Sequence, residues 1–352
     1  MDLVWAILLF LLGLGLLVKG ADWLVEGAAK IAKRFGVSDL VIGLTIVACG
    51  TSLPEFCASV AGSFYGNSAI AMGNIVGSNI ANIAFILALA GIVAPFGVKK
   101  GIYARDGLIM LLTAVLFYLF SLDLVLTTAE GGILLFLFFL YIAYFITSKR
   151  PFWREFHFGD FRRIVLFKDI PKAAGSVGKS LPHKARAFQD GVKKAFHVSN
   201  AEFFYYAKVF GMLFLGVICL YFGAQFVIDA AESFPLDQLL IGLIFVAVGT
   251  SLPELFVTIS SMKRKMPEIM VGNIVGSNIV NILWVGGSAA IVSPLTVPAI
   301  SLRSNFIFML FITWLFLVFL RNDRKITRLE AATLLLFYAA FVATTLGITL
   351  GL

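Results

Sequence analysis

The sequence predicts an all-α integral membrane protein with ten transmembrane helices in two inverted five-helix repeats. Of its 352 residues, 60% are hydrophobic and only 14% are charged, and the mean hydropathy is +0.97. A soluble globule of this size would need far more polar residues to cover its surface. Two long motifs also occur twice, at a constant offset of 199 residues, which indicates an internal repeat.

The predicted spans are apolar stretches close to the ~20 residues that cross a bilayer. Five lie in the first half, at residues 2–30, 38–62, 68–95, 103–121 and 130–148. Five more lie in the second half, at residues 206–231, 236–262, 267–293, 302–320 and 329–350. Because each repeat crosses the membrane an odd number of times, the second repeat enters from the opposite side. The expected domains are therefore a first repeat over 1–148, a basic linker over 149–205 and an inverted repeat over 206–352.

Lysine and arginine predict the orientation. With both termini outside, all of the 28 basic residues except Lys19 and Arg303 fall on the inner side, as the positive-inside rule requires. The outer loops carry acidic residues instead: Asp123, Glu130, Glu232 and Asp237. Most of the net charge of +8 is thus a topology signal, which argues against nucleic acid as a partner. We expect a multi-pass protein of the cell membrane with a cytoplasmic linker.

The linker is strongly basic, with 12 Lys or Arg against four Asp or Glu over residues 149–197. Aromatic and basic residues alternate over 152–163. Two interpretations stay open: a helix that lies on the anionic lipids of the inner leaflet, or a solvated connector.

The first repeated motif is Gly50-Thr51-Ser52-Leu53-Pro54-Glu55, which returns as Gly249-Thr250-Ser251-Leu252-Pro253-Glu254. A glutamate near the bilayer midplane costs about 2.5–3.5 kcal/mol, so its presence needs a functional reason. Each proline removes a backbone donor, and we expect it to open its helix at the preceding glycine. Broken backbone at this depth is tolerated where a partner helix, water or an ion satisfies it.

The second repeated motif runs from Gly73 to Asn82 and returns from Gly272 to Asn281. Within it a serine and an asparagine four residues apart share one helical face. Together the motifs predict a cation site lined by Glu55, Glu254, Thr51, Ser52, Thr250, Ser251, Ser78, Asn82, Ser277 and Asn281. This set is all oxygen, which suits Ca²⁺ and Na⁺, whereas zinc or copper would require His or Cys.

On these motifs the chain resembles the calcium/cation antiporter superfamily, and most closely its compact prokaryotic sodium/calcium exchangers. The resemblance implies secondary active exchange of Ca²⁺ for Na⁺ by alternating access, in which the first and sixth helices slide against the other helices. It implies that Glu55 and Glu254 are shared ligands, joined by the carbonyls of Ala48 and Ala247. No cofactor beyond the transported ions, and no oligomer, is required. Some relatives carry Asp where Asn281 stands.

Other functions remain open from the sequence. The same fold can be coupled to H⁺ or K⁺, and the sequence does not determine the coupling ion, stoichiometry, direction or oligomeric state. A cation channel also uses carboxylates within the membrane, but channels usually arrange several chains around a pore. An enzyme is not expected, because no His, Lys or Cys in the apolar segments is placed as a base or nucleophile.

Overall fold

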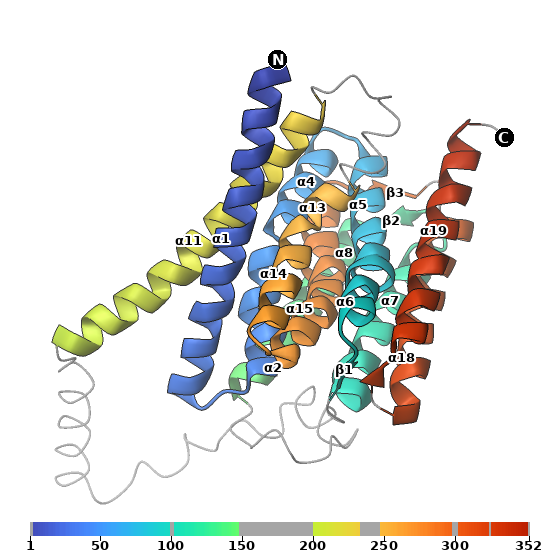
Figure 1. Ribbon diagram of the computed structural model, residues 1–352. Helices are drawn as coiled ribbons and strands as arrows, with labels where there is room; N and C mark the ends of the chain where they lie inside the picture. The colour runs from blue at the N-terminus through green and yellow to red at the C-terminus, as the bar shows by residue number, and fades with distance from the viewer. Residues whose placement is uncertain are drawn as a thin grey trace, which may run out of the picture.

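The computed structural model describes residues 3–98, 102–147, 200–232, 247–297, 302–323 and 325–350, and these are nearly all helical (Figure 1). The first repeat contains α1 (Leu3–Phe35), α2 (Asp39–Ile42), the π-helix η1 (Gly43–Val47), α3 (Ala48–Thr51), α4 (Leu53–Phe64), α5 (Ser68–Ala81), the π-helix η2 (Asn82–Leu87), α6 (Ala88–Val93), β1 (Phe96–Gly97), the π-helix η3 (Ile102–Gly107), α7 (Leu108–Phe120), β2 (Val125–Leu126) and α8 (Thr128–Thr147).

The second repeat has the same order of elements. It contains α11 (Asn200–Glu232), α13 (Ala247–Thr250), α14 (Leu252–Lys263), α15 (Pro267–Val280), the π-helix η5 (Asn281–Gly286), α16 (Gly287–Val292), β3 (Leu295–Thr296), the π-helix η6 (Leu302–Phe306), α18 (Ile307–Asp323), β4 (Lys325–Ile326) and α19 (Arg328–Leu350). The four two-residue strands are an addition to the all-helical fold that the sequence predicts.

The described helices account for eight of the ten predicted spans. Seven are long and apolar enough to cross a membrane, and the bent pair Asp39–Thr51 and Leu53–Phe64 makes an eighth. Of the other two, the span predicted at 236–262 begins outside the described residues, and the span at 103–121 corresponds to η3 and α7. The segment 152–163, for which a lipid-bound helix and a solvated connector are both open, also lies outside them.

The structure has the inverted arrangement of the two repeats. In Figure 1, α1 descends from the N-terminus while α11 ascends beside it, and both termini lie at the upper end of the molecule. The strands link the repeats crosswise, since β1 pairs with β4 and β2 pairs with β3. Each pair joins two connections that the predicted topology places on the same side of the membrane. α11 begins at Asn200 rather than 206, because its helix continues beyond the apolar stretch.

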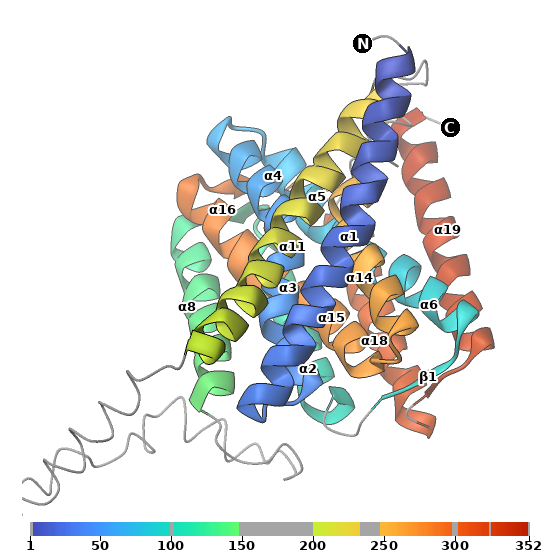
Figure 2. The same cartoon turned by 60° about the vertical axis from the view of Figure 1, so that its left-hand side comes forward.

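Glycines bring α1 and α11 into backbone contact, and the two helices run side by side across one face of the bundle (Figure 2). A Cβ on Gly20 would lie 2.8 Å from the carbonyl oxygen of Gly216, and a Cβ on Gly13 would lie 2.9 Å from that of Gly223. Small residues at a helix interface allow this close approach in membranes. The other helices form the body against which this pair lies.

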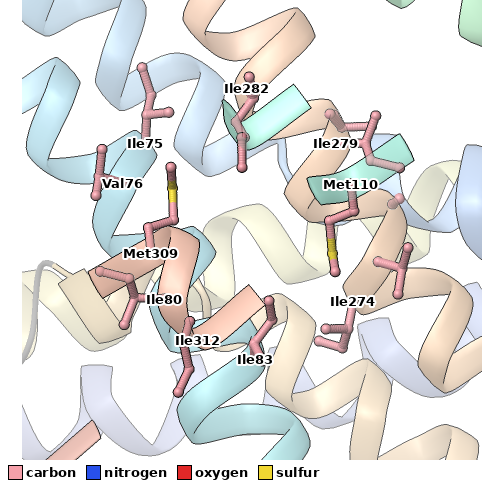
Figure 3. Close-up of a cluster of buried hydrophobic side chains, with 14 of the residues drawn as sticks. Ile75, Val76, Ile80, Ile83, Met110, Ile274, Ile279, Ile282, Met309 and Ile312 are labelled. Carbon is pink, nitrogen blue, oxygen red and sulfur yellow. The ribbon is translucent and has the colours of Figure 1, made fainter. Parts of the chain in front are cut away.

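The core between α5 and α15 is built from residues that correspond in the two repeats. Figure 3 shows these buried side chains, among them Met110 from α7 and Met309 from α18. α7 packs against α15 and α18 packs against α5, so each repeat fills the core of the other. α5 and α15 carry the second repeated motif, and this mutual packing fixes them side by side at the centre of the molecule.

Candidate cation site

The first motif forms a break in a helix. Ser52 interrupts the helix between α3 and α4, with φ −81° and ψ 9°. Ser251 interrupts the helix between α13 and α14, with φ −88° and ψ 7°. The two segments around Ser52 are bent by 46°. The prediction that the helix opens at Gly50 was wrong by two residues: Gly50 still belongs to α3. Pro54 lies in the first turn of α4, where a missing N–H is tolerated, so the break falls directly before that turn.

Both glutamates lie in the first turn of the helix that follows the break, and both are fully buried. Hydroxyl groups cross between the repeats to reach them. Ser52 Oγ donates to Glu254 Oε1 at 3.4 Å, and Ser251 Oγ donates to Glu55 Oε1 at 3.3 Å. The positive end of each helix dipole also faces its glutamate. Among the described residues, no ion pair involves either carboxylate.

The second motif supplies further polar groups. Ser277 Oγ donates to Glu254 Oε1 at 3.2 Å and lies 3.3 Å from Thr51 Oγ1. Asn281 Nδ2 donates to Ser78 Oγ at 3.0 Å, across the repeats. Asn82 and Asn281 are the first residues of η2 and η5, and π-helical turns often occur at functional sites.

Four buried oxygens at this place have no hydrogen-bond partner among the described residues: Glu55 Oε2, Glu254 Oε2, Asn82 Oδ1 and Asn281 Oδ1. Both asparagine nitrogens donate within the protein, Asn82 Nδ2 to Asn278 Oδ1 at 3.0 Å and Asn281 Nδ2 to Ser78 Oγ. Their amide oxygens are therefore the atoms left unpaired. Leaving a buried acceptor unsatisfied costs about 1–3 kcal/mol, so these four oxygens have lone pairs available for a ligand, and a cation binds through such lone pairs.

The remaining predicted groups lie at the same break. The Ala48 carbonyl accepts from Thr51 Oγ1 at 3.2 Å and from Ser52 N at 3.0 Å. Thr250 precedes Ser251 at the end of α13, and Ala247 is the first residue of α13. The structure thus places the predicted side chains on elements that pack together, with hydrogen bonds between the repeats around Glu254, around Glu55 and at the two asparagines. Asp22 and Glu26 lie on α1 and contact Ser260 and Arg264 of α14 instead.

Sequence reasoning missed three asparagines of the second motif. Asn74 Oδ1 accepts a hydrogen bond from Thr250 Oγ1, and Asn273 Oδ1 accepts one from Thr51 Oγ1, each at 3.1 Å. Asn278 Oδ1 accepts one from Asn82 Nδ2. A signal for two of them was present. Asn74 precedes Ser78 by four residues, the same spacing that placed Ser78 and Asn82 on one face.

Glycines of the second motif allow the broken helix to approach closely. A Cβ on Gly272 would lie 2.8 Å from the carbonyl oxygen of Leu40, and a Cβ on Gly276 would lie 2.8 Å from that of Leu44.

Comparison with known proteins agrees with this geometry. The family model for "Sodium/calcium exchanger protein" matches residues 5–147 and 208–347. The sodium/calcium exchanger MaX1 of Methanosarcina acetivorans is 36% identical over 340 residues, covering 95% of this chain and 97% of MaX1. The inner membrane protein YrbG of Escherichia coli is 31% identical over 314 residues, covering 88% of this chain and 86% of YrbG.

A solved structure of the sodium-calcium exchanger NCX_Mj, soaked without Na⁺ and Ca²⁺, superposes with a TM-score of 0.75 at 26% identity, covering 98% of this chain and 100% of that one. The family match spans both repeats and the fold match spans nearly the whole chain, with the same inverted organisation. The chain is a multi-pass membrane protein that belongs to the sodium/calcium exchanger family.

Proposed function

We propose that this protein is a secondary active antiporter that exchanges Ca²⁺ for Na⁺ at one site built around Glu55 and Glu254. The observation that carries the proposal is the set of four buried, unpaired oxygens, two from each repeat, on elements that pack against one another, α4 against η5 and α14 against η2. The exchanger relatives support Ca²⁺ and Na⁺ as the transported ions.

The chemistry of the donors fits both ions. Ca²⁺ takes six to eight oxygen ligands and tolerates irregular geometry. The two carboxylates balance its charge, while the amides of Asn82 and Asn281 and the hydroxyls of Thr51 and Ser277 add neutral oxygens. Na⁺ needs the same hard ligands but only one charge, so it competes for parts of the same set. Competition for shared ligands is what couples the two fluxes.

Alternating access is supported by an asymmetry between the repeats. α1 packs against α14, and Val257 and Ser260 on that face are buried. Their counterparts on α4, Ala58 and Ala61, are half-buried and exposed. The protein is thus closed along α14 and more open along α4, as one state of a carrier with a central site would be.

Polar contacts hold the closed side together. Ser260 Oγ donates to Asp22 Oδ1 at 2.6 Å, and Arg264 Nη2 lies 3.2 Å from Glu26 Oε2. By the positive-inside rule, this end of the molecule, with Lys263, Arg264 and the linker, faces the cytoplasm. Under this proposal the structure corresponds to a state closed to the cytoplasm.

The test is Ca²⁺ uptake by proteoliposomes that hold the purified protein, with outward gradients of Na⁺, K⁺ or H⁺ imposed one at a time. We expect uptake with the Na⁺ gradient and little with the others. If uptake requires K⁺ or H⁺ instead, that ion, and not Na⁺, is the coupling ion. Rapid uptake without any counter-gradient would contradict an antiporter and favour a channel.

A further inference from the structure

Thr51 is placed to donate or to accept hydrogen bonds, and this choice matters at a cation site. A hydroxyl has one proton and two lone pairs, and only the lone pairs can bind a cation. Four groups with acceptor oxygens lie near Thr51 Oγ1: Asn273 Oδ1 at 3.1 Å, the carbonyl of Ala48 at 3.2 Å, Ser277 Oγ at 3.3 Å and the carboxylate of Glu254, with which the hydroxyl also forms a hydrogen bond. The position of one proton therefore decides whether Thr51 presents lone pairs or a positive dipole to the ion.

The first repeat shows how the asparagine is oriented. Asn74, the counterpart of Asn273, donates through Nδ2 to the carbonyl of Glu55 at 3.1 Å and to Ser59 Oγ at 2.9 Å. Its Oδ1 is left to face Thr250 Oγ1 at 3.1 Å. Asn273 likewise turns Oδ1, rather than its nitrogen, toward Thr51. An amide oxygen is only an acceptor, so both threonines must donate to their asparagines.

We propose that Asn273 and Asn74 are positioning residues that hold the hydroxyl protons of Thr51 and Thr250 and so turn the threonine lone pairs toward the cation. This rests on the proposed cation site. The other acceptors near Thr51 are the Ala48 carbonyl and the Glu254 carboxylate. Both are proposed ligands, and an ion bound there would occupy their lone pairs. Ser277 already donates its proton to Glu254 Oε1. Asn273 is then the acceptor that does not compete with the ion.

The expected effect is larger for Ca²⁺ than for Na⁺. Without Asn273, the Thr51 proton would turn to the Ala48 carbonyl or to Ser277 and would block an oxygen that the ion needs. A divalent ion repels a misplaced hydroxyl dipole about twice as strongly as a monovalent ion at the same distance. Outer-shell partners of metal ligands typically contribute about 10–100-fold in affinity.

Asn273 is the better residue to replace because its side chain makes fewer other hydrogen bonds than that of Asn74. Its Nδ2 has no hydrogen-bond partner among the described residues, and Thr258 Oγ1, the counterpart of Ser59 Oγ, has none either. Replacing Asn273 therefore removes one hydrogen bond, to Thr51, whereas replacing Asn74 would also release the Glu55 carbonyl.

The experiment is a double-mutant cycle with Asn273→Leu, Thr51→Val and both together, on full-length protein in detergent. Equilibrium binding of Ca²⁺ and of Na⁺ and the melting temperature are measured for each. We expect each single variant to lower Ca²⁺ affinity by about tenfold or more. The Ca²⁺ affinity of the double variant should lie within about twofold of that of the weaker-binding single variant, because both changes remove the same interaction.

The inference would be overturned if the fold losses of Ca²⁺ affinity in the two single variants multiply in the double variant. It would also be overturned if the Ca²⁺ affinity of Asn273→Leu is within about twofold of that of the parent. If Asn273→Leu does not fold, Asn273→Ala takes its place in the cycle. Failure of the proposed exchange is seen separately, in the parent protein under ion gradients. A parent that binds neither cation would overturn both.

Discussion

At the scale of single residues, the site holds two carboxylates and two neutral amides at equivalent positions. Asn82 and Asn281 are fully buried, and their nitrogens are committed to protein partners, so each can offer a cation only its oxygen. Under the proposed function, the two glutamates give the site a fixed charge of minus two, which one Ca²⁺ balances. Adding a carboxylate at either amide would change that balance without changing the shape of the side chain.

Asn281→Asp should make Ca²⁺ exchange more dependent on pH than in the parent protein. A third carboxylate next to Glu55 and Glu254 repels both in a poorly hydrated site, so a proton or an extra monovalent cation must fill the deficit. Ca²⁺ flux measured against pH for parent and variant tests this. Parallel pH profiles would show that position 281 does not share the electrostatics of the site.

Asn281→Leu is the matched variant without an oxygen. It should reduce Ca²⁺ transport strongly across the whole pH range, because a dehydrated ion loses a ligand that buried surroundings cannot replace with water. The same flux measurement applies. Transport equal to that of the parent would mean that Asn281 does not face the ion.

At the scale of elements, glycines hold α1 and α11 in backbone contact. Gly20→Ala should weaken this pair, because its Cβ would lie 2.8 Å from the Gly216 carbonyl oxygen and 2.9 Å from the backbone nitrogen of Leu220. Overpacking of this kind costs about 1–3 kcal/mol. We expect a lower melting temperature and slower Ca²⁺ uptake. Gly15→Ala is the control on the same helix, since a Cβ there meets nothing within 4 Å; equal effects of both would contradict this account.

The contact between α1 and α14 has no charged counterpart in the other repeat. At the offset of 199 residues, the position equivalent to Glu26 is Gln225, and the position equivalent to Arg264 is Tyr65. The Glu26–Arg264 pair therefore stabilises closure on one side only. Because the two side chains are 36% and 34% exposed, the pair contributes no more than about 1 kcal/mol.

Arg264→Gln should shift the carrier toward the state open along α14. A loss of up to about 1 kcal/mol corresponds to a change of up to about fivefold in the population ratio of the two states. Apparent Ca²⁺ affinity should rise on the linker side of proteoliposomes and fall on the opposite side. Lys263→Gln removes the same charge from a residue with no ion pair among those described, and should shift neither. A change in the same direction on both sides would point to the binding site instead.

At the scale of the whole molecule, the repeated motifs were enough to predict the inverted fold. The constant offset of 199 residues defines two copies, and because each copy has five spans, an odd number, the second copy must enter the membrane from the opposite side. The details that escaped depend on three-dimensional contacts. Pro54 marks a break, but whether the helix opens at Gly50 or Ser52 depends on which turn accommodates the missing N–H. Asn273 was missed because its partner, Thr51, belongs to the opposite repeat. The π-helical turns leave no trace in an apolar pattern.

The central claim is that one site, shared by both repeats, carries the ion. The most direct measurement is Na⁺-dependent Ca²⁺ uptake by proteoliposomes with the parent protein, Glu55→Gln or Glu254→Gln, each checked for folding by its melting temperature. Glu130→Gln serves as the control, because its carboxylate caps α8 through the backbone N–H of Thr127 at 2.8 Å, a role that Gln can also fill.

Removing one partner of a buried charge interaction costs about 2–5 kcal/mol, more than about 30-fold in affinity. The account predicts that either glutamine at the site abolishes uptake while the folded protein and the Glu130→Gln control remain intact. Uptake close to that of the parent in a folded Glu55→Gln or Glu254→Gln variant would contradict it.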